Sequence, residues 1–280
     1  MDATTAIAAY NSISFPIVSL FASGIVLFIT LPLAAVLGYV SGARTRRRQL
    51  KNGREIELVL GETTLAAILA LLGLLLAFSF GHALSLSNTN KITLIEEAAA
   101  LGTAFARADI LADPGRTELQ VALLEYAETR LFDEVKTMTT AEAQASIQKS
   151  LEAQAKLWPL TIELVADPLP PALKAFVASS INDVLDAHLL RTQTLSTPVS
   201  EVANAMLLAI VLTALFLLGN RAGAQGRALT WRTFVFSGFL FVITLTIADI
   251  QRSEQGTVQI DKTAMHATIL EMRLALRDRL

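Results

Sequence analysis

The sequence has no cysteine, only three histidines in 280 residues, and only 17% charged residues. The lack of cysteine excludes disulfide scaffolds, thiol nucleophiles and cysteine-based zinc or iron–sulfur sites. Positive charge is not in excess either, since 23 Lys and Arg face 25 Asp and Glu, which disfavours nucleic-acid binding. Apolar residues, in contrast, make up 53% of the chain, and the mean hydropathy is +0.51. Because soluble proteins have roughly a quarter of charged residues, this composition indicates a membrane protein.

Four apolar segments are long enough to cross a bilayer, which takes roughly 20 residues. They cover residues 13–40, 64–86, 202–218 and 234–250. We do not expect the first to be a cleavable signal peptide, which has a basic segment before a short apolar run. Here the residues before the apolar run include Asp2 but no basic residue, and the run is longer than that of a signal peptide. The segment 87–200, between the second and third spans, has the size of one domain and a helical pattern almost throughout. We therefore expect an all-α membrane protein with four transmembrane helices and a helical domain inserted between helices 2 and 3.

Within this domain, a rigid stalk over 94–111 is expected to continue out of the second span. Asp113 followed by Pro114 predicts an N-cap and first helical position. A further helix is expected from about 139 to 158, then a proline-punctuated connector that begins at Pro159, then a helix over 172–195. Residues 251–280 are interpreted as a C-terminal tail.

Basic residues predict the orientation. The loop 41–63 has six Lys and Arg, and the loop 219–233 has three with no acid. Short loops rich in Lys and Arg stay in the cytoplasm, whereas a long domain can cross largely regardless of its charge. The domain 87–200, with nine basic and fifteen acidic residues, and both termini are therefore predicted on the opposite side of the membrane.

Several short patterns occur in a characteristic order: GLLLAFSF at 73–80, EEAAALGTAFARADIL at 96–111, LLEYAETRL at 123–131, LW at 157–158, INDVLDAHLLR at 181–191, Pro198, and IADIQRSEQGTVQI at 247–260. Together they resemble the bestrophin-like family of largely uncharacterised bacterial membrane proteins. The chain departs from the family pattern at Ala99, where the family often has Asn, and at SLSNTN, where it often has basic residues. The resemblance implies a homo-oligomeric ion channel, by analogy with anion-conducting bestrophins, in a bacterial inner membrane. True bestrophins keep the helical domain in the cytosol, but the basic loops predict a periplasmic domain here.

In the second span, Leu76, Phe80 and Leu84 recur every four residues, a spacing similar to the hydrophobic neck of bestrophin channels. When several subunits place such a row around a common pore axis, the apolar constriction closes the pore to ions by excluding water. The alternative is plain packing against lipid or core, since any spanning helix offers an apolar row.

The stalk carries two further stripes. Glu96, Thr103 and Arg107 share one helical face, either as a polar ion-path lining or as groups that dock the stalk onto neighbouring helices. The small residues Ala98, Gly102 and Ala106 permit close helix packing.

On the last domain helix, Asn182, Asp186 and Arg191 are interpreted as a buried polar network, for instance with Arg107, that sets the register of the bundle. A metal site is not predicted, because Asp186 and His188 point about 200° apart on a helix. No cofactor is expected.

There is no phosphate-binding loop, nucleophile elbow or HExxH motif, so we do not expect an enzyme. Two functions remain. One is an oligomeric ion-conducting or transport assembly; the other is a membrane-anchored helical domain that senses, scaffolds or binds an unidentified protein partner through 87–200 without transport.

Overall fold

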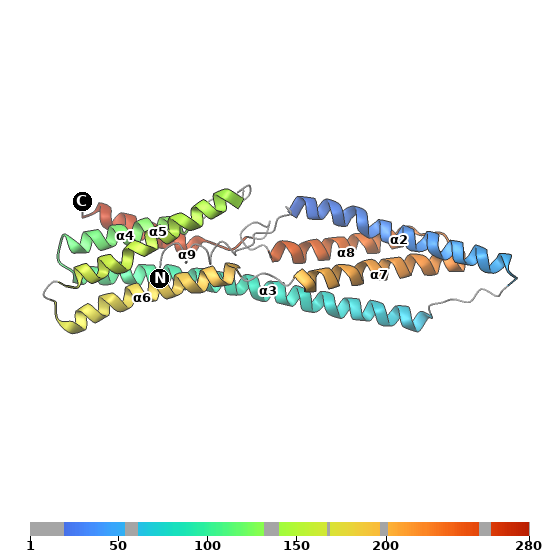
Figure 1. Cartoon of the computed structure of the whole chain (residues 1–280), viewed down its shortest axis with the longest axis horizontal. Coiled ribbons are helices and arrows are strands. Elements are labelled where there is room, and N and C mark those ends of the chain that lie inside the picture. Colours follow the sequence, from blue (N-terminus) through green and yellow to red (C-terminus); the bar gives the residue numbers. More distant parts are fainter. Residues whose placement is uncertain are drawn as a thin grey trace.

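The chain folds into two helical bundles that lie end to end (Figure 1). The structure is a computed structural model that describes residues 20–53, 61–131, 140–166, 169–196, 201–251 and 259–279. One end holds α2 (Leu20–Lys51), α7 (Glu201–Gln225), α8 (Trp231–Ile250) and the first half of α3 (Glu62–Arg107). The other end holds the second half of α3, η1 (Ala108–Ile110), α4 (Gly115–Thr129), α5 (Thr140–Leu164), α6 (Pro171–Ser196) and α9 (Thr263–Arg277). We call these ends the membrane bundle and the helical body.

The membrane bundle contains the helices that are long and apolar enough to cross a membrane, namely α2, α3, α7 and α8. This confirms the expectation of four apolar spans, although residues 13–19 of the first predicted span lie outside the described residues. The protein is therefore an all-α protein suited to a bilayer, over the part of the chain that the structure describes.

Helix α3 belongs to both bundles. With 46 residues at 1.5 Å each, it is roughly 69 Å long, about twice the ~30 Å apolar thickness of a bilayer. The span predicted at 64–86 and the stalk predicted at 94–111 are thus parts of one continuous helix, which ends at Arg107. About half of α3 must stand outside the membrane.

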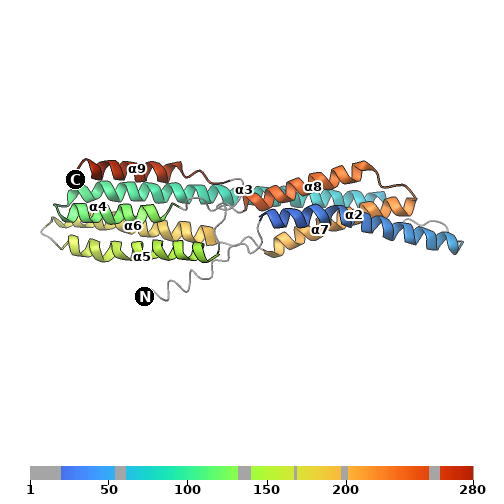
Figure 2. The same ribbon diagram turned by 90° about the horizontal axis from the view of Figure 1, so that it is seen from above.

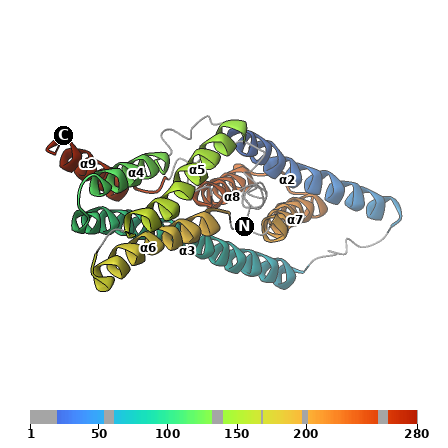
Figure 3. The same ribbon diagram turned by 60° about the vertical axis from the view of Figure 1, so that its left-hand side comes forward.

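Glycines hold α2 and α7 in close contact. Gly38 and Gly42 of α2 and Gly219 and Gly223 of α7 each lie where a Cβ atom would overlap the backbone of the other helix. Both pairs have G-x-x-x-G spacing, which lets two membrane helices approach closely. Helix α7 lies between α2 and α3 in this bundle (Figure 3).

The helical body has its own apolar core, to which α3, α4, α5, α6 and α9 all contribute. Figure 2 shows α9 and α5 on opposite outer sides, with α3, α4 and α6 between them. The core side chains of α9 are Met265, Ile269, Met272 and Leu276, all nearly fully buried. The interpretation of 251–280 as a tail is therefore wrong for α9: the spacing of these four residues gives it an apolar face, which completes the body. The body is not built from the segment 87–200 alone.

Two other expected boundaries differ. Helix α2 continues to Lys51, so Arg44 to Lys51 are helical rather than part of a loop; Arg, Lys and Gln favour helix, and the helix stops before Gly53, whose φ is 62°. Pro159 lies inside α5, not in the connector.

The start of α4 differs slightly from its prediction. Pro114 occupies the N-cap position and the helix begins at Gly115. The Asp113 carboxylate still serves this helix end, because it accepts hydrogen bonds from Thr117 Oγ1, at 2.9 Å, and from the Arg116 guanidinium.

Candidate functional site: the two faces of α3

One face of α3 is exposed along nearly its whole length. Every seventh residue from Leu71 lies on it, and all are exposed: Leu71, Phe78, Ser85, Ile92, Ala99 and Ala106. Leu71 is 50% exposed and Phe78 66%. Four more residues at the same seven-residue interval flank this row and are also exposed: His82, Thr89, Glu96 and Thr103. We call these ten residues the open face. Within the predicted span it carries Leu71 and Phe78 and, near the end of that span, His82 and Ser85; beyond the span its residues are small or polar except for Ile92.

The predicted gate row does not coincide with the open face. Leu76 is only 9% exposed and belongs to the apolar core of the membrane bundle, whereas Phe80 and Leu84 are exposed. Because residues two apart on a helix point about 200° apart, Phe80 and Phe78 cannot serve the same axis. The structure gives Phe78 the more exposed position.

The predicted polar row divides in the same way. Glu96 and Thr103 lie on the open face, but Arg107 is half-buried. Its guanidinium stacks 3.9 Å from the centre of the Phe176 ring, and its Nη1 donates to the Phe176 carbonyl oxygen at 3.3 Å. Arg107 therefore joins α3 to α6.

The small-residue row also turns from core to surface. Ala98 is buried and Gly102 half-buried, with the Thr268 methyl group of α9 3.7 Å from the point where a Gly102 Cβ would lie. Ala106 is exposed and belongs to the open face. Gly102 thus packs against α9. Ala98 belongs to the apolar core of the helical body, and Ala106 does not.

On the opposite face of α3, Glu97 is completely buried in a cluster of ionisable side chains. Its Oε1 accepts hydrogen bonds from Arg130 Nε and from the Tyr126 hydroxyl, both at 2.7 Å. Its Oε2 accepts from Arg191 Nη1, also at 2.7 Å. His188 Nδ1 lies 2.8 Å from the Tyr126 hydroxyl oxygen. We call these five residues the Glu97 cluster; it joins α3 to the C-terminal end of α4 and to α6.

The electrostatics of the cluster favour an ionised carboxylate and a neutral histidine. Burial raises the pKa of Glu97, but the charges of Arg130 and Arg191 and its hydrogen bonds outweigh burial and lower it from 4.5 to about 2. Burial and the nearby Arg130 charge lower the pKa of His188 from 6.5 to about 3. Burial raises the pKa of Tyr126 well above its usual value.

These protonation states fix the direction of the hydrogen bonds. The single hydroxyl proton of Tyr126 goes to Glu97, so the short contact with His188 requires a proton on Nδ1 that points at the tyrosine oxygen. The cluster is thus an ordered chain of donors that ends on one carboxylate. Such an arrangement fixes the register of the three helices that it joins.

The sequence-predicted network is only partly the observed one. Arg191 does take part in a buried network, but its partner is Glu97. Asn182 and Asp186 are exposed and bond to each other at 3.2 Å, so neither reaches Arg107. Among the described residues, no three His, Asp or Glu side chains gather in a way that suits a metal.

Sequence reasoning missed Glu97, Tyr126 and Arg130 as partners. A signal existed: Glu97 has the helical phase of Leu94, Leu101 and Ala104, all buried, and a charge at a core position needs a partner. Tyr126 and Arg130 are four residues apart, which places both on one side of the helix end.

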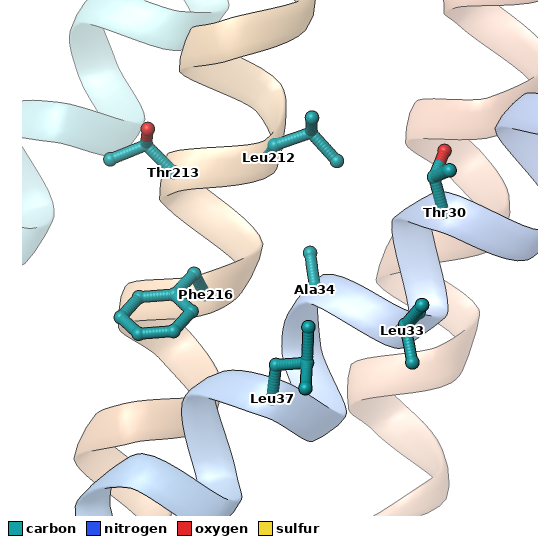
Figure 4. A pocket seen from close by; sticks show the side chains of 7 residues that line it. All are labelled: Thr30, Leu33, Ala34, Leu37, Leu212, Thr213 and Phe216. Carbon is teal, nitrogen blue, oxygen red and sulfur yellow. The ribbon is translucent and has the colours of Figure 1, made fainter.

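An open groove of about 400 Å³ lies between α2 and α7 of the membrane bundle (Figure 4). Its two polar side chains are satisfied within their own helices, since Thr30 Oγ1 donates to the Val26 carbonyl and Thr213 Oγ1 to the Ala209 carbonyl. The groove therefore offers an apolar surface, as a lipid chain requires. Its other lining residues are Leu33, Ala34, Leu37, Leu212 and Phe216.

No protein-family model matches this chain, and no curated protein matches it either. The resemblance to the bestrophin-like family and the activity it implies therefore stay predictions.

Proposed function

We propose that the protein is a homo-oligomeric, ion-conducting membrane assembly in which α3 of each copy turns its open face toward a common axis. The observation that supports this is the open face itself, which keeps a seven-residue interval from Leu71 to Ala106. A sustained seven-residue interval is the pattern by which helices wind around one another in a left-handed supercoil. Lipid could cover the face within the membrane, but not its continuation outside.

The composition of the open face suits close packing outside the membrane. Ala99 and Ala106, which lie beyond the predicted span, are small, and small residues let helix backbones approach. Leu71 and Phe78 lie within the predicted span and would form the apolar constriction of the path, in place of Phe80 and Leu84. Such a constriction controls flow by dewetting.

Charge on the open face favours cations over the anions that the resemblance implies. Glu96 is its one acidic residue, and it has no Lys or Arg. Repeated around an axis, Glu96 would form a carboxylate ring, which attracts cations. Arg107, the basic residue expected in such a lining, is engaged with Phe176. The proposed setting remains a bacterial inner membrane with the helical body on the periplasmic side.

Single-cysteine crosslinking tests the assembly, because the chain has no native cysteine. Ala99→Cys on the open face should crosslink two copies through a short bifunctional maleimide. Asp183→Cys, exposed on α6, is the matched control and should not. If both variants crosslink equally, or neither does while the solubilised protein has the mass of a monomer, the assembly is wrong.

Flux from liposomes tests conduction in the same preparation. Phe78→Ala should increase cation flux, and Glu96→Gln should lower the preference for K⁺ over Cl⁻. An oligomer that passes no ion would refute conduction and favour the membrane-anchored binding protein.

A further inference from the structure

The end of the membrane bundle farthest from the helical body carries a dense group of basic side chains. Exposed on the last turns of α2 are Arg44, Arg47, Arg48 and Lys51, and exposed in or beside the connection from α7 to α8 are Arg227 and Arg232. We call these six residues the basic surface. Among the described residues of 41–63 and 219–233, Glu62 is the only acidic one.

The two parts of the basic surface meet. The Arg46 guanidinium of α2 lies directly against the backbone of Gly226, where a Cβ atom would overlap it. Gly226 has φ 71° and ends the turn after α7. A side chain at this position would push Arg46 away, so glycine lets the end of α2 and the α7–α8 connection form one continuous surface.

The surface lies at the level of lipid headgroups. The apolar part of α2 from Leu20 to Val40 is long enough to cross the bilayer core at ~1.5 Å per residue, so Arg44 and the residues after it emerge at the interface. Trp231, at the start of α8, is 70% exposed and is next to Arg232. Exposed tryptophan is typical of the membrane–water interface, which gives an independent marker of the same level.

We propose that the basic surface binds the headgroups of anionic phospholipids in the adjacent leaflet. Clusters of four to eight Lys and Arg directly beside a membrane helix have this specificity, because the anionic leaflet attracts them and arginine bonds phosphate oxygens through two donors at once. The apolar groove between α2 and α7 offers the acyl chains a surface on the same pair of helices. This binding does not depend on the proposed oligomer or on conduction.

Energy transfer from Trp231 to a dansyl-labelled lipid measures the binding on the full chain in detergent. Trp158→Phe removes the only other tryptophan, so the signal comes from the basic surface. Labelled phosphatidylglycerol should bind at least tenfold more tightly than labelled phosphatidylcholine, and added salt should reduce the difference. Equal affinity for the two lipids would overturn the proposal.

Charge-matched variants separate a local surface from a general effect of net charge. Arg44→Gln, Arg47→Gln and Arg48→Gln together should abolish the preference for phosphatidylglycerol. Lys149→Gln, Lys156→Gln and Arg277→Gln together remove three exposed charges from the helical body and should leave it intact. If both triple variants lost the preference for phosphatidylglycerol, the binding would not be local to the basic surface and the proposal would be refuted.

A second pair of substitutions and a competition experiment complete the test. Arg227→Gln with Arg232→Gln should lower the preference without touching α2, and an unchanged elution profile shows that each variant folds. Inorganic phosphate at millimolar concentration should not compete with the labelled lipid. Full competition by phosphate would show a site for free anions and overturn the assignment to lipid.

Discussion

Replacing Glu97 by Gln removes the charge on which two buried guanidinium groups converge. Arg130 and Arg191 are 3% and 1% exposed, and each bonds Glu97 at 2.7 Å. The fall in the Glu97 pKa from 4.5 to about 2 corresponds to about 3 kcal/mol at roughly 1.4 kcal/mol per unit. Removing one partner of a buried ion pair costs about 3–5 kcal/mol. We therefore expect Glu97→Gln to lower the free energy of unfolding of the helical body by about 3 kcal/mol or more.

Trp158 of α5 reports on the helical body, and Trp231 of α8 reports on the membrane bundle. In a Trp231→Phe background, the protein is unfolded by denaturant in detergent while Trp158 fluorescence is monitored. This measurement should show the decrease in the free energy of unfolding of the helical body. Glu96→Gln is the matched control: it makes the same chemical change one residue away, at an exposed position, and should change stability by less than about 0.5 kcal/mol. Equal stability of the Glu96 and Glu97 variants would refute the assigned role of the cluster.

Acid should destabilise the helical body through His188 before it affects Glu97. The pKa of His188 is about 3 in the folded protein against 6.5 for the free side chain. Below about pH 6.5 the unfolded chain therefore binds a proton that the folded chain does not, and the free energy of unfolding falls as the pH drops. Protonation of Glu97 lowers the free energy of unfolding further only between about pH 4.5 and 2. Unfolding of a His188→Gln variant should therefore vary less between pH 6.5 and 4.5 than that of the parent. Gly219→Ala should weaken the contact between α2 and α7 by about 1–3 kcal/mol through overpacking, measured by unfolding in mixed micelles, whereas Gly238→Ala, with open space around its position, should cost nothing. Met272→Ala should cost the helical body about 2–5 kcal/mol, because its side chain is 2% exposed in the core; a smaller loss, comparable to that of an exposed side chain, would mean that α9 does not belong to the body in solution.

The membrane helices could be predicted from sequence because crossing a bilayer is a local property of length and charge. The sequence predicts the apolar parts of α7 and α8 within a few residues, and it predicts that the second span continues into the stalk 94–111. The end of α2 was misplaced because Arg44 to Lys51 signal a membrane boundary without ending a helix. Charge marks where a helix leaves the bilayer, not where it stops.

The partners of the Glu97 cluster could not be predicted, because they come from helices far apart in the chain. The sequence identifies Arg191 as a network residue, but its partner Glu97 lies 94 residues away in the chain. Only the packing of α6 on α3 selects Glu97 rather than Glu96 as that partner. Helix α9 was missed for another reason. Its apolar face shows only in the spacing of Met265, Ile269 and Met272, which the interpretation of 251–280 as a tail does not use.

Helix α3 is the element through which the two bundles act on each other. It contributes Leu72, Leu76 and Ala83 to the core of the membrane bundle and Leu94, Ala98, Leu101 and further residues to the core of the helical body. No other single helix of the described chain contributes to both. Because the helix is unbroken from Glu62 to Arg107, the Glu97 cluster fixes the rotation of α3 about its own axis, and with it the direction of the open face inside the membrane. In the proposed ion-conducting assembly, loosening the cluster should thus change ion flux as well as stability, although the cluster lies outside the predicted spans.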